Sequence, residues 1–514
     1  MSARPPSPDP ETLALAQRAA ELESQEQWAG AAVAWSSVAA REPNLIPAQL
    51  RLAQARIRAG QPGDAIVVLE PLTVRAPDLA AAWLALGVAY SLVDRHGDAV
   101  RAGARAATLA PGVPAAHLGL GDILLRDGDP RGAEGAYRQA LALSPGHPDA
   151  LTKLAALARA EGRRDDAEAL LTGALAGTPD HPYARINLAM IAIRRHRVDE
   201  ARRLLEAVLA SPALAPEVRT LASESLAAIA ERERLRTPVD AALASKGPLP
   251  IELALRSIEP PEAVDEALLA AISTVVERAA GTPSIEARFT PRRVPSAAWP
   301  AIEAHHCYVF DDDPNARARS ARLVAGAEPP ASPKDLDVVH YASVAATRPA
   351  AGTIPPDGIA CEAWLRWTHA RLVRHRDDYW PGLLNPLGNA RLGGSDHART
   401  PPRAIAGTLR HAFADIGSRL PPGGRRAAAA LLAILWIHPF LNGNKRLARA
   451  VANHELAAAG FMPHLNLAGA DREVYAIAHE ARRTRDAQPL ALWLAAATHR
   501  AAERDARYAL DGVA

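Results

Sequence analysis

A regular spacing of proline and alanine in the N-terminal part of the chain is the feature that most narrows the folds open to it. Five prolines stand 34 residues apart, at Pro43, Pro77, Pro111, Pro145 and Pro179. Six alanines recur with the same period, at Ala31, Ala65, Ala99, Ala133, Ala167 and Ala201. Such a period indicates a repeated pair of helices, with the small residue where the two helices approach closely. Six such units fit between residues 11 and 212.

The period and the residues around it resemble the tetratricopeptide repeat. The third unit shows the fuller pattern, with Trp83, Leu86, Gly87, Tyr90, Ala99, Ala106 and Pro111. Stacked helix pairs of this kind form a concave groove, so the resemblance implies a peptide or partner protein bound there. A rigid spacer or a contact in a homodimer is the alternative. We expect a polar capping helix within residues 213–236, from about Pro216 to Arg236, because a terminal repeat must present a wetted face.

Composition favours helices throughout the chain. Only 4% of the 514 residues are aromatic while alanine is abundant, which predicts an all-α protein of two or three domains. A formal net charge of +2 gives no case for nucleic acid as a partner. The proline-rich residues 1–10 read as a disordered N-terminus, and no segment resembles a secretory signal or a membrane span, so we expect a cytoplasmic protein without a membrane partner. The two cysteines, Cys307 and Cys361, read as reduced structural thiols.

A short polar loop between two apolar runs carries the chemistry of the chain. The run Ala427–Trp436 suits a buried helix, and the apolar spacing resumes at Leu447. If the second helix begins near Asn444, its free N–H groups point into the loop and attract anions. Three cations stand at the start of this helix: Lys445, Arg446 and Arg449. Cations at a helix N-terminus oppose the macrodipole unless an anion joins them, so the pattern predicts a phosphate site.

The loop resembles the signature of Fic/Doc proteins, H-x-F-x-(D/E)-(G/A)-N-(G/K)-R. The matching residues are His438, Phe440, Gly443, Asn444, Lys445 and Arg446. Proteins of this family mostly transfer AMP from ATP to a hydroxyl of a target protein, and some relatives transfer phosphate or phosphocholine. The resemblance therefore implies a helical Fic-type domain, ATP as the nucleotide substrate, and a target protein with a Ser, Thr or Tyr hydroxyl.

The resemblance also implies a role for each residue of the loop. His438 is the general base that removes the proton of the attacking hydroxyl, for which an imidazole pKa near the working pH is suited. Phe440 is expected to be buried and to hold the loop in shape. Gly443 and Asn444 cradle the α-phosphate, and Gly443 lets the backbone approach closely. Arg446 and its neighbour one turn on, Arg449, bind the outer phosphates through their planar forks.

Two positions in the loop leave alternatives open. Asn442 stands where the family has an acid that holds Mg²⁺, and a neutral amide is a weaker ligand for that cation. Lys445 resembles the Doc branch, in which the nucleotide binds reversed and the γ-phosphate is transferred. The alternatives to AMP transfer are thus a Doc-like phosphotransferase, or a catalytically weakened Fic-like binding or scaffold protein.

The remainder of the catalytic region is less fully specified. We predict a linker and N-terminal part at residues 237–359 and a Fic-like domain at 360–514, with its core at 360–460. A flap hairpin that pairs with the target is expected within Tyr379–Pro402. Helices are expected at about 402–418, 424–437, 444–459, 471–484 and 488–506.

Two glutamates match the spacing of the inhibitory motif (S/T)-x-x-x-E-(G/N) that many Fic proteins carry. Thr282 leads to Glu286, and Ser273 leads to Glu277. Neither is followed by Gly or Asn, and each glutamate read alone is an ordinary surface charge. The acids Asp311–Asp313 are read as a solvated turn.

Overall fold

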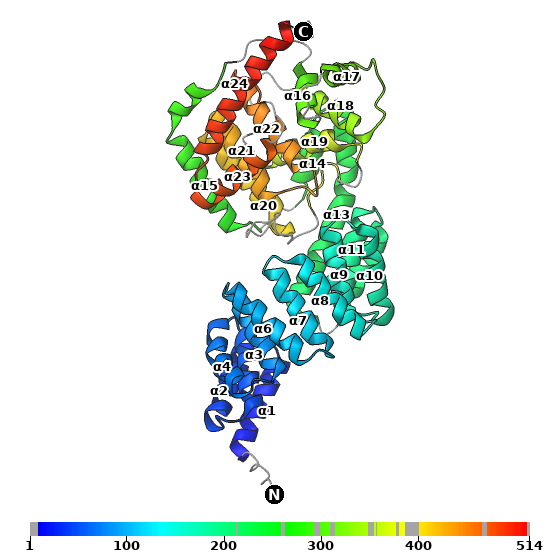
Figure 1. Cartoon of the computed structure of the whole chain (residues 1–514). Helices are drawn as coiled ribbons and strands as arrows, with labels where there is room; N and C mark the ends of the chain where they lie inside the picture. The colour runs from blue at the N-terminus through cyan, green and yellow to red at the C-terminus, as the bar shows by residue number, and fades with distance from the viewer. Residues whose placement is uncertain are drawn as a thin grey trace. The chain divides into compact units, whose positions relative to one another are not determined.

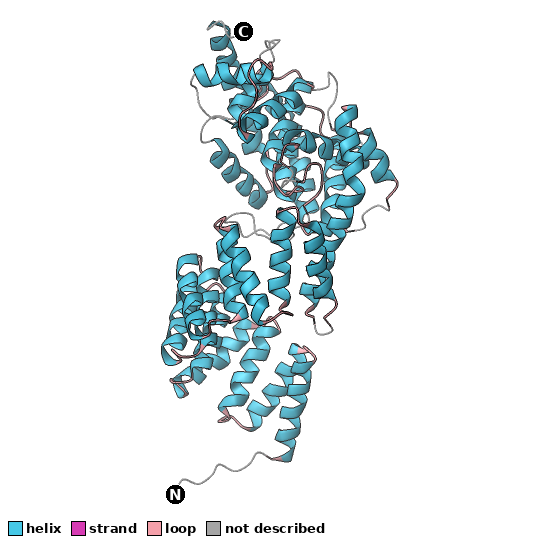
Figure 2. Cartoon of the chain, turned by 90° about the vertical axis from the view of Figure 1, so that its right-hand side faces the viewer, coloured by secondary structure: helices cyan, strands magenta, loops and turns pink. Residues whose placement is uncertain are grey.

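The computed structural model describes residues 9–211, 214–258, 263–291, 299–308, 314–347, 354–355, 357–376, 380–385, 400–464 and 470–510. Helices make up 78% of this part, which confirms the predicted all-α class (Figure 2). Its only β pairings, within the described ranges, are two isolated bridges: Pro291 with Phe461, and Leu384 with Phe440. Among the described residues, none of the helices combines the length and the apolar character of a membrane span. The chain divides into two compact units, Met1–Ile191 and Ala192–Ala514.

The first unit is a succession of antiparallel helix pairs, coloured blue to teal in Figure 1. Its helices are α1 (Pro10–Ser24), α2 (Trp28–Arg41), α3 (Ile46–Arg58), α4 (Pro62–Arg75), α5 (Ala80–Leu92), α6 (His96–Leu109), α7 (Pro114–Arg126), α8 (Pro130–Leu143), α9 (Pro148–Ala160), α10 (Arg164–Gly177) and α11 (Pro182–Arg194). From α3 to α11, the first helix of each pair begins 34 residues after the first helix of the preceding pair. The period read from the prolines is therefore the period of the fold.

Small residues allow these pairs to pack closely. The six recurring alanines have exposed fractions of 0% or 1%. Gly121 is a second example, because a Cβ there would lie 2.3 Å from Cε1 of Tyr137 on the next helix. The Tyr137 hydroxyl passes over this glycine and donates a hydrogen bond to Asp122 Oδ1 at 2.7 Å. A side chain at residue 121 would displace the ring from the core.

The second unit contains the predicted catalytic region. Its helices are α12 (Val198–Leu209), α13 (Pro216–Ser245), α14 (Leu249–Arg256), α15 (Glu266–Ala280), the 3₁₀ helix η1 (Pro283–Arg288), α16 (Trp299–Tyr308), α17 (Pro314–Val324), α18 (Pro333–Ala346), α19 (Gly358–Val373), α20 (Pro402–Arg419), α21 (Gly424–Ile437), α22 (Asn444–Ala458), α23 (Ala470–Thr484) and α24 (Gln488–Leu510). The five helices expected after residue 400 begin and end within a few residues of these bounds.

The predicted capping helix is longer than the sequence analysis expects. α13 continues past Arg236 to Ser245 and includes Pro238. It continues because its apolar spacing does: Leu235, Val239 and Ala242 are buried, with exposed fractions of 0%, 3% and 0%. The helix packs against α12, the second helix of the sixth pair, as expected of a cap, and also packs against α14 and α19 of the second unit.

The core of the second unit is built around α21. All fourteen of its residues are buried, and α15, α20, α22 and α24 pack on it (Figure 1). Its alanines, Ala427–Ala430, let these neighbours approach on every side. From Ala427 onward the helix is apolar all round, so it must be enclosed in this way.

Three predictions fall on parts of the chain that lie outside the described residues. They are the disordered N-terminus over its first eight residues, the solvated turn at Asp311–Asp313, and the hairpin of the flap. Of the flap segment the structure describes residues 380–385 and 400–402.

Candidate active site at the junction of α21 and α22

The loop between α21 and α22 begins with an abrupt change of backbone direction at His438. This residue ends α21 in the left-handed conformation, with φ 54° and ψ 56°, and its N–H donates to Ile434 O at 3.0 Å. A positive φ is uncommon for a residue other than glycine. Here it turns the histidine off the buried helix, so that His438 is partly exposed although every residue of α21 is buried.

Asn444 fixes the shape of the loop from inside. Its side chain is buried, and its Oδ1 accepts a hydrogen bond from Phe440 N at 2.9 Å while its Nδ2 donates to Phe440 O at 2.6 Å. The same Nδ2 lies 3.2 Å from His438 Nδ1. The side chain of Asn444 thus holds the loop and the catalytic candidate together, a different task from the phosphate contact that the resemblance implies for this residue.

A second histidine contacts the loop and helps to hold its shape. His369 on α19 is fully buried, and its Nε2 lies 2.8 Å from Asn442 O while its Nδ1 accepts from Gly382 N at 3.1 Å. Its ring stacks on Phe440, with centroids 3.9 Å apart and planes 10° apart. Burial lowers the pKa of His369 to about 3, so the ring is neutral, with its proton on Nε2. Phe440 itself has an exposed fraction of 0%.

Gly443 is required at its position for two reasons. Its φ of 80° lies in the left-handed region, and it is the residue from which α22 starts. A Cβ there would lie 2.9 Å from His369 Nε2 and 3.1 Å from Val373 Cγ1. In the structure the close approach at this glycine is an approach to His369; the expected contact with a phosphate stays a prediction.

The described start of the flap segment pairs with the loop. Leu384 forms an antiparallel bridge with Phe440, and Asn385 N donates to Pro439 O at 2.8 Å. The described start of this segment is thus held against Pro439 and Phe440, the two residues that follow His438 in the chain.

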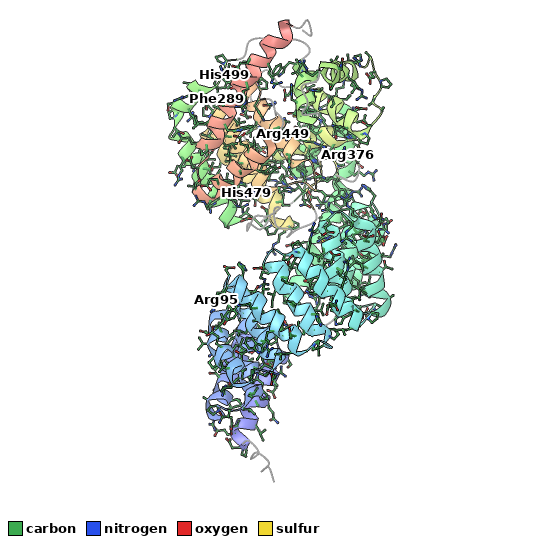
Figure 3. All side chains as sticks on the ribbon, viewed as in Figure 1. Arg95, Phe289, Arg376, Arg449, His479 and His499 are labelled. Atoms are coloured by element: carbon green, nitrogen blue, oxygen red, sulfur yellow. The ribbon has the colours of Figure 1, made fainter. Side chains whose placement is uncertain are left out.

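The three cations at the start of α22 contact three different neighbours. Lys445 is exposed, with its Nζ 4.2 Å from the ring centroid of Tyr475 on α23. Arg449 is buried, and its Nη1 donates to Cys307 O on α16 at 3.4 Å (Figure 3). Arg446 lies between them and is partly exposed. The structure brings all three to one helix end, as predicted, but anchors each one separately.

Arg446 is held by an acid that the sequence analysis does not identify. Its Nη1 and Nη2 lie 3.0 and 3.3 Å from the two carboxylate oxygens of Asp337, a buried residue of α18. The same carboxylate accepts from Arg376, at 2.8 Å from Nη2, and lies 3.2 Å from His375 Nε2 (Arg376 is labelled in Figure 3). Asp337 falls in the stretch 237–359, where a lone acid in a helical pattern gives no signal of a long-range partner.

The loop is a poor match for a dedicated magnesium site. Asn442 is exposed, but its Oδ1 already accepts a hydrogen bond from Gly443 N at 2.8 Å. No group of three or more His, Cys, Asp or Glu residues that could hold a metal occurs in the part of the chain that is described. Because Mg²⁺ prefers carboxylates and substrate phosphates, a neutral and already bonded amide contributes little. The magnesium ion stays a prediction.

Glu286 has a structural role that differs from the predicted inhibitory one. Its carboxylate accepts from the N–H groups of Gly424 and Arg425, at 2.8 and 3.0 Å, and from Arg425 Nε at 3.0 Å. It thus caps the N-terminus of α21, about 20 Å of helix away from His438. Glu277 lies exposed on α15. The contacts of Glu286 are explained by this cap, without an inhibitory contact at the loop.

Comparison with known proteins follows the same division of the chain. A model of the Fic/DOC family matches residues 360–456, and tetratricopeptide repeat models match 50–114, 124–172 and 158–224. No curated protein matches the chain.

Several solved repeat proteins are similar to part of the chain. A thermophilic TPR protein of Thermus thermophilus is 22% identical, over 35% of this chain and 99% of its own, with a TM-score of 0.33. MamA is 26% identical, over 31% and 93%, with a TM-score of 0.27. The pilF protein of Pseudomonas aeruginosa is 17% identical, over 38% and 90%, with a TM-score of 0.32. From the family models, the chain carries tetratricopeptide repeats within residues 50–224 and a Fic/DOC-family domain at residues 360–456.

Proposed function

We propose that this protein is a Fic-type transferase that moves AMP from ATP to a hydroxyl side chain of a target protein. One observation carries the proposal: a partly exposed histidine, His438, stands beside the N-terminus of α22 on the loop that the Fic/DOC model matches. A base and an anion site on one short loop are the two elements that nucleotidyl transfer to a hydroxyl requires.

The start of α22 supplies the anion site. The first hydrogen bond within this helix runs from Leu447 N to Gly443 O, at 3.0 Å. The N–H groups of the preceding residues therefore have no carbonyl within the helix to bond. Amides aimed at a phosphate in this way stabilise the charge that develops on its oxygens during transfer. The positive φ of Gly443 is what aims the first turn at the loop.

The proposed reaction is an in-line substitution at the α-phosphorus. The target hydroxyl oxygen forms a bond to that phosphorus, the bond to the bridging oxygen of the β-phosphate breaks, and pyrophosphate leaves. The proton of the hydroxyl passes to the imidazole of His438.

The tautomer of His438 adds a condition to this step. An amide NH₂ group only donates, so the contact from Asn444 Nδ2 makes His438 Nδ1 an acceptor and leaves the proton of the neutral ring on Nε2. For Nε2 to accept a proton, the proton of the ring must first move to Nδ1. At 3.2 Å the contact is at the long end of the hydrogen-bond range, so substrate binding can break it at small expense.

The repeats are proposed to recruit the target protein. Tetratricopeptide repeats are protein-interaction modules, and their stacked pairs form an extended surface. A spacer or a homodimer contact is the alternative for this region. Transfer assays with the natural target distinguish these roles. Repeats that recruit the target accelerate its modification, whereas a spacer or a homodimer contact does not.

Labelled nucleotides test the proposed reaction. The full chain is incubated with a cell lysate and ATP labelled at either the α- or the γ-phosphate, with His438→Ala as the matched control. Protein labelled from the α-position only in the presence of His438 supports AMP transfer. Protein labelled from the γ-position alone would identify a phosphotransferase, the alternative suggested by Lys445. Protein labelled from neither position would favour a binding protein.

A further inference from the structure

A small cavity between α13 and the end of α19 gathers positive charge apart from the loop. It has a volume of about 90 Å³, and the ionisable groups that line it are Arg232, Arg236, Asp240 and Arg374. Trp380 and the apolar Val239 form part of its wall. Among the ionisable groups that line the cavity, arginines outnumber acids. None of its lining residues belongs to the loop Ile437–Arg449.

Two of these arginines lack an acidic partner among the described residues. Arg236 is exposed on α13 and forms no ion pair there, although Asp240 stands four residues on. Arg374 Nε donates instead to a neutral group, His340 Nε2, at 2.7 Å. Burial and then the charge of Arg374 lower the pKa of His340 to about 3 and that of Arg371 to about 10. Within the described residues, Arg374 thus meets a neutral imidazole and no carboxylate.

Trp380, which forms part of the cavity wall, has an unusual backbone conformation. Trp380 has a φ of 50°, which for a bulky residue is an outlier, and its exposed fraction is 1%. The turn that holds it is closed by Leu383 N donating to Trp380 O at 3.0 Å and is tied to His369 through Gly382 N. The Arg232 guanidinium lies 4.9 Å from the centroid of the indole ring. Strained residues persist where their surroundings fix them, often at binding sites.

We propose that this cavity is a binding site for a single phosphate group, held by Arg236 and Arg374 against the indole wall. Its volume corresponds to about three water molecules, which suits one phosphate group, whereas a whole nucleotide needs several hundred cubic ångströms. Guanidinium forks match phosphate oxygens in pairs, and apolar walls strengthen their attraction for an anion. The group can be free inorganic phosphate or the phosphate of a phosphorylated side chain.

The test is a calorimetric titration of the full chain with inorganic phosphate at constant ionic strength. We expect saturable binding to the wild-type protein that is at least tenfold weaker in Arg236→Ala/Arg374→Gln. Arg234→Ala is the matched control, because Arg234 is also exposed on α13 but lies outside this cavity. It should bind phosphate as the wild type does. Thermal melts without phosphate check folding, and Arg236→Ala alone serves if the double variant does not fold.

The loop is the competing phosphate site, so a third variant separates the two. Lys445→Ala weakens the loop and should leave binding at the cavity unchanged. Binding lost in Lys445→Ala but kept in the double variant would place the anion at the loop and overturn the proposal. An affinity for acetate equal to that for phosphate would also overturn the proposal. Competition by O-phosphoserine would support a phosphorylated protein as the source, and binding of inorganic phosphate alone would support the free ion.

Discussion

Replacing Asp337 by asparagine should make the protein less stable and at the same time improve its affinity for nucleotide. The carboxylate occupies both outer nitrogens of Arg446, at 3.0 and 3.3 Å, and these are the groups with which a guanidinium binds phosphate oxygens. Under the proposed function, ATP must therefore compete with Asp337 for Arg446. Asparagine keeps the shape of the side chain and removes its charge.

The size of both effects follows from burial. The side chain of Asp337 is 3% exposed, while those of Arg446 and Arg376 are 20% and 24% exposed. Removing one partner of a fully buried ion pair costs about 3–5 kcal/mol, and partial exposure of the arginines reduces this to about 2–3 kcal/mol. We expect the Tm to fall by about 5 °C. Releasing Arg446 should contribute about 1 kcal/mol to nucleotide binding, which lowers the KM for ATP about fivefold.

Asp335→Asn is the control for this experiment. Asp335 lies on the same helix, is also buried, and pairs with Arg319 at 2.8 and 3.0 Å, whereas the carboxylate that holds Arg446 is that of Asp337. Both variants should lower the Tm, measured by calorimetry, but only Asp337→Asn should lower the KM for ATP in a radiolabel transfer assay. A KM that stays unchanged or rises in Asp337→Asn would show that the carboxylate orients Arg446 for its task and does not compete with the nucleotide.

Four further outcomes test the site. His438→Ala should abolish transfer with an unchanged Tm, because the ring lies outside the core; retained activity would remove it as the base. Gly443→Ala should lower the stability by about 2 kcal/mol, measured by denaturant unfolding, because its φ is positive and its Cβ would meet a buried ring. The fragment 192–514 should fold and keep basal transfer but lose its natural target; full-rate transfer to that target would exclude recruitment by the repeats. Asn442→Asp should raise turnover at low magnesium, and slower turnover at every magnesium concentration would contradict this.

The repeat region was predictable because its signal is local and periodic. The 34-residue spacing of prolines and alanines is repeated often enough to fix the helix pairs without any long-range information. The same holds for α21 and α22, whose bounds follow from an apolar run, a proline and a glycine. The buried position of Phe440 likewise follows from its place in the motif.

The partners of the loop were not predictable in this way. His369 and Asp337 lie 73 and 109 residues before the groups they contact, Asn442 and Arg446, and nothing in their own neighbourhood points to the loop. One signal was available for His369: a histidine within the apolar run of α19 has to find hydrogen-bond partners when it is buried. The match of Glu286 to the inhibitory motif was a weaker signal. The four-residue spacing from Thr282 to Glu286 does not show which helix end the carboxylate will contact.

The contacts of Asp337 also explain why its exchange with a nucleotide is feasible. A buried carboxylate that lost its only cation would be left uncompensated, and the loss would oppose binding by several kcal/mol. Asp337 has Arg376 at 2.8 Å in addition to Arg446, so its charge stays paired when Arg446 turns towards a phosphate. His438 is in a comparable position, since Asn444 keeps both hydrogen bonds to Phe440 if the imidazole leaves it. Arg446 and His438 are therefore each held by a residue that has other partners. Substrate can displace the contact of Arg446 with Asp337, and that of His438 with Asn444, without leaving a buried polar group unsatisfied.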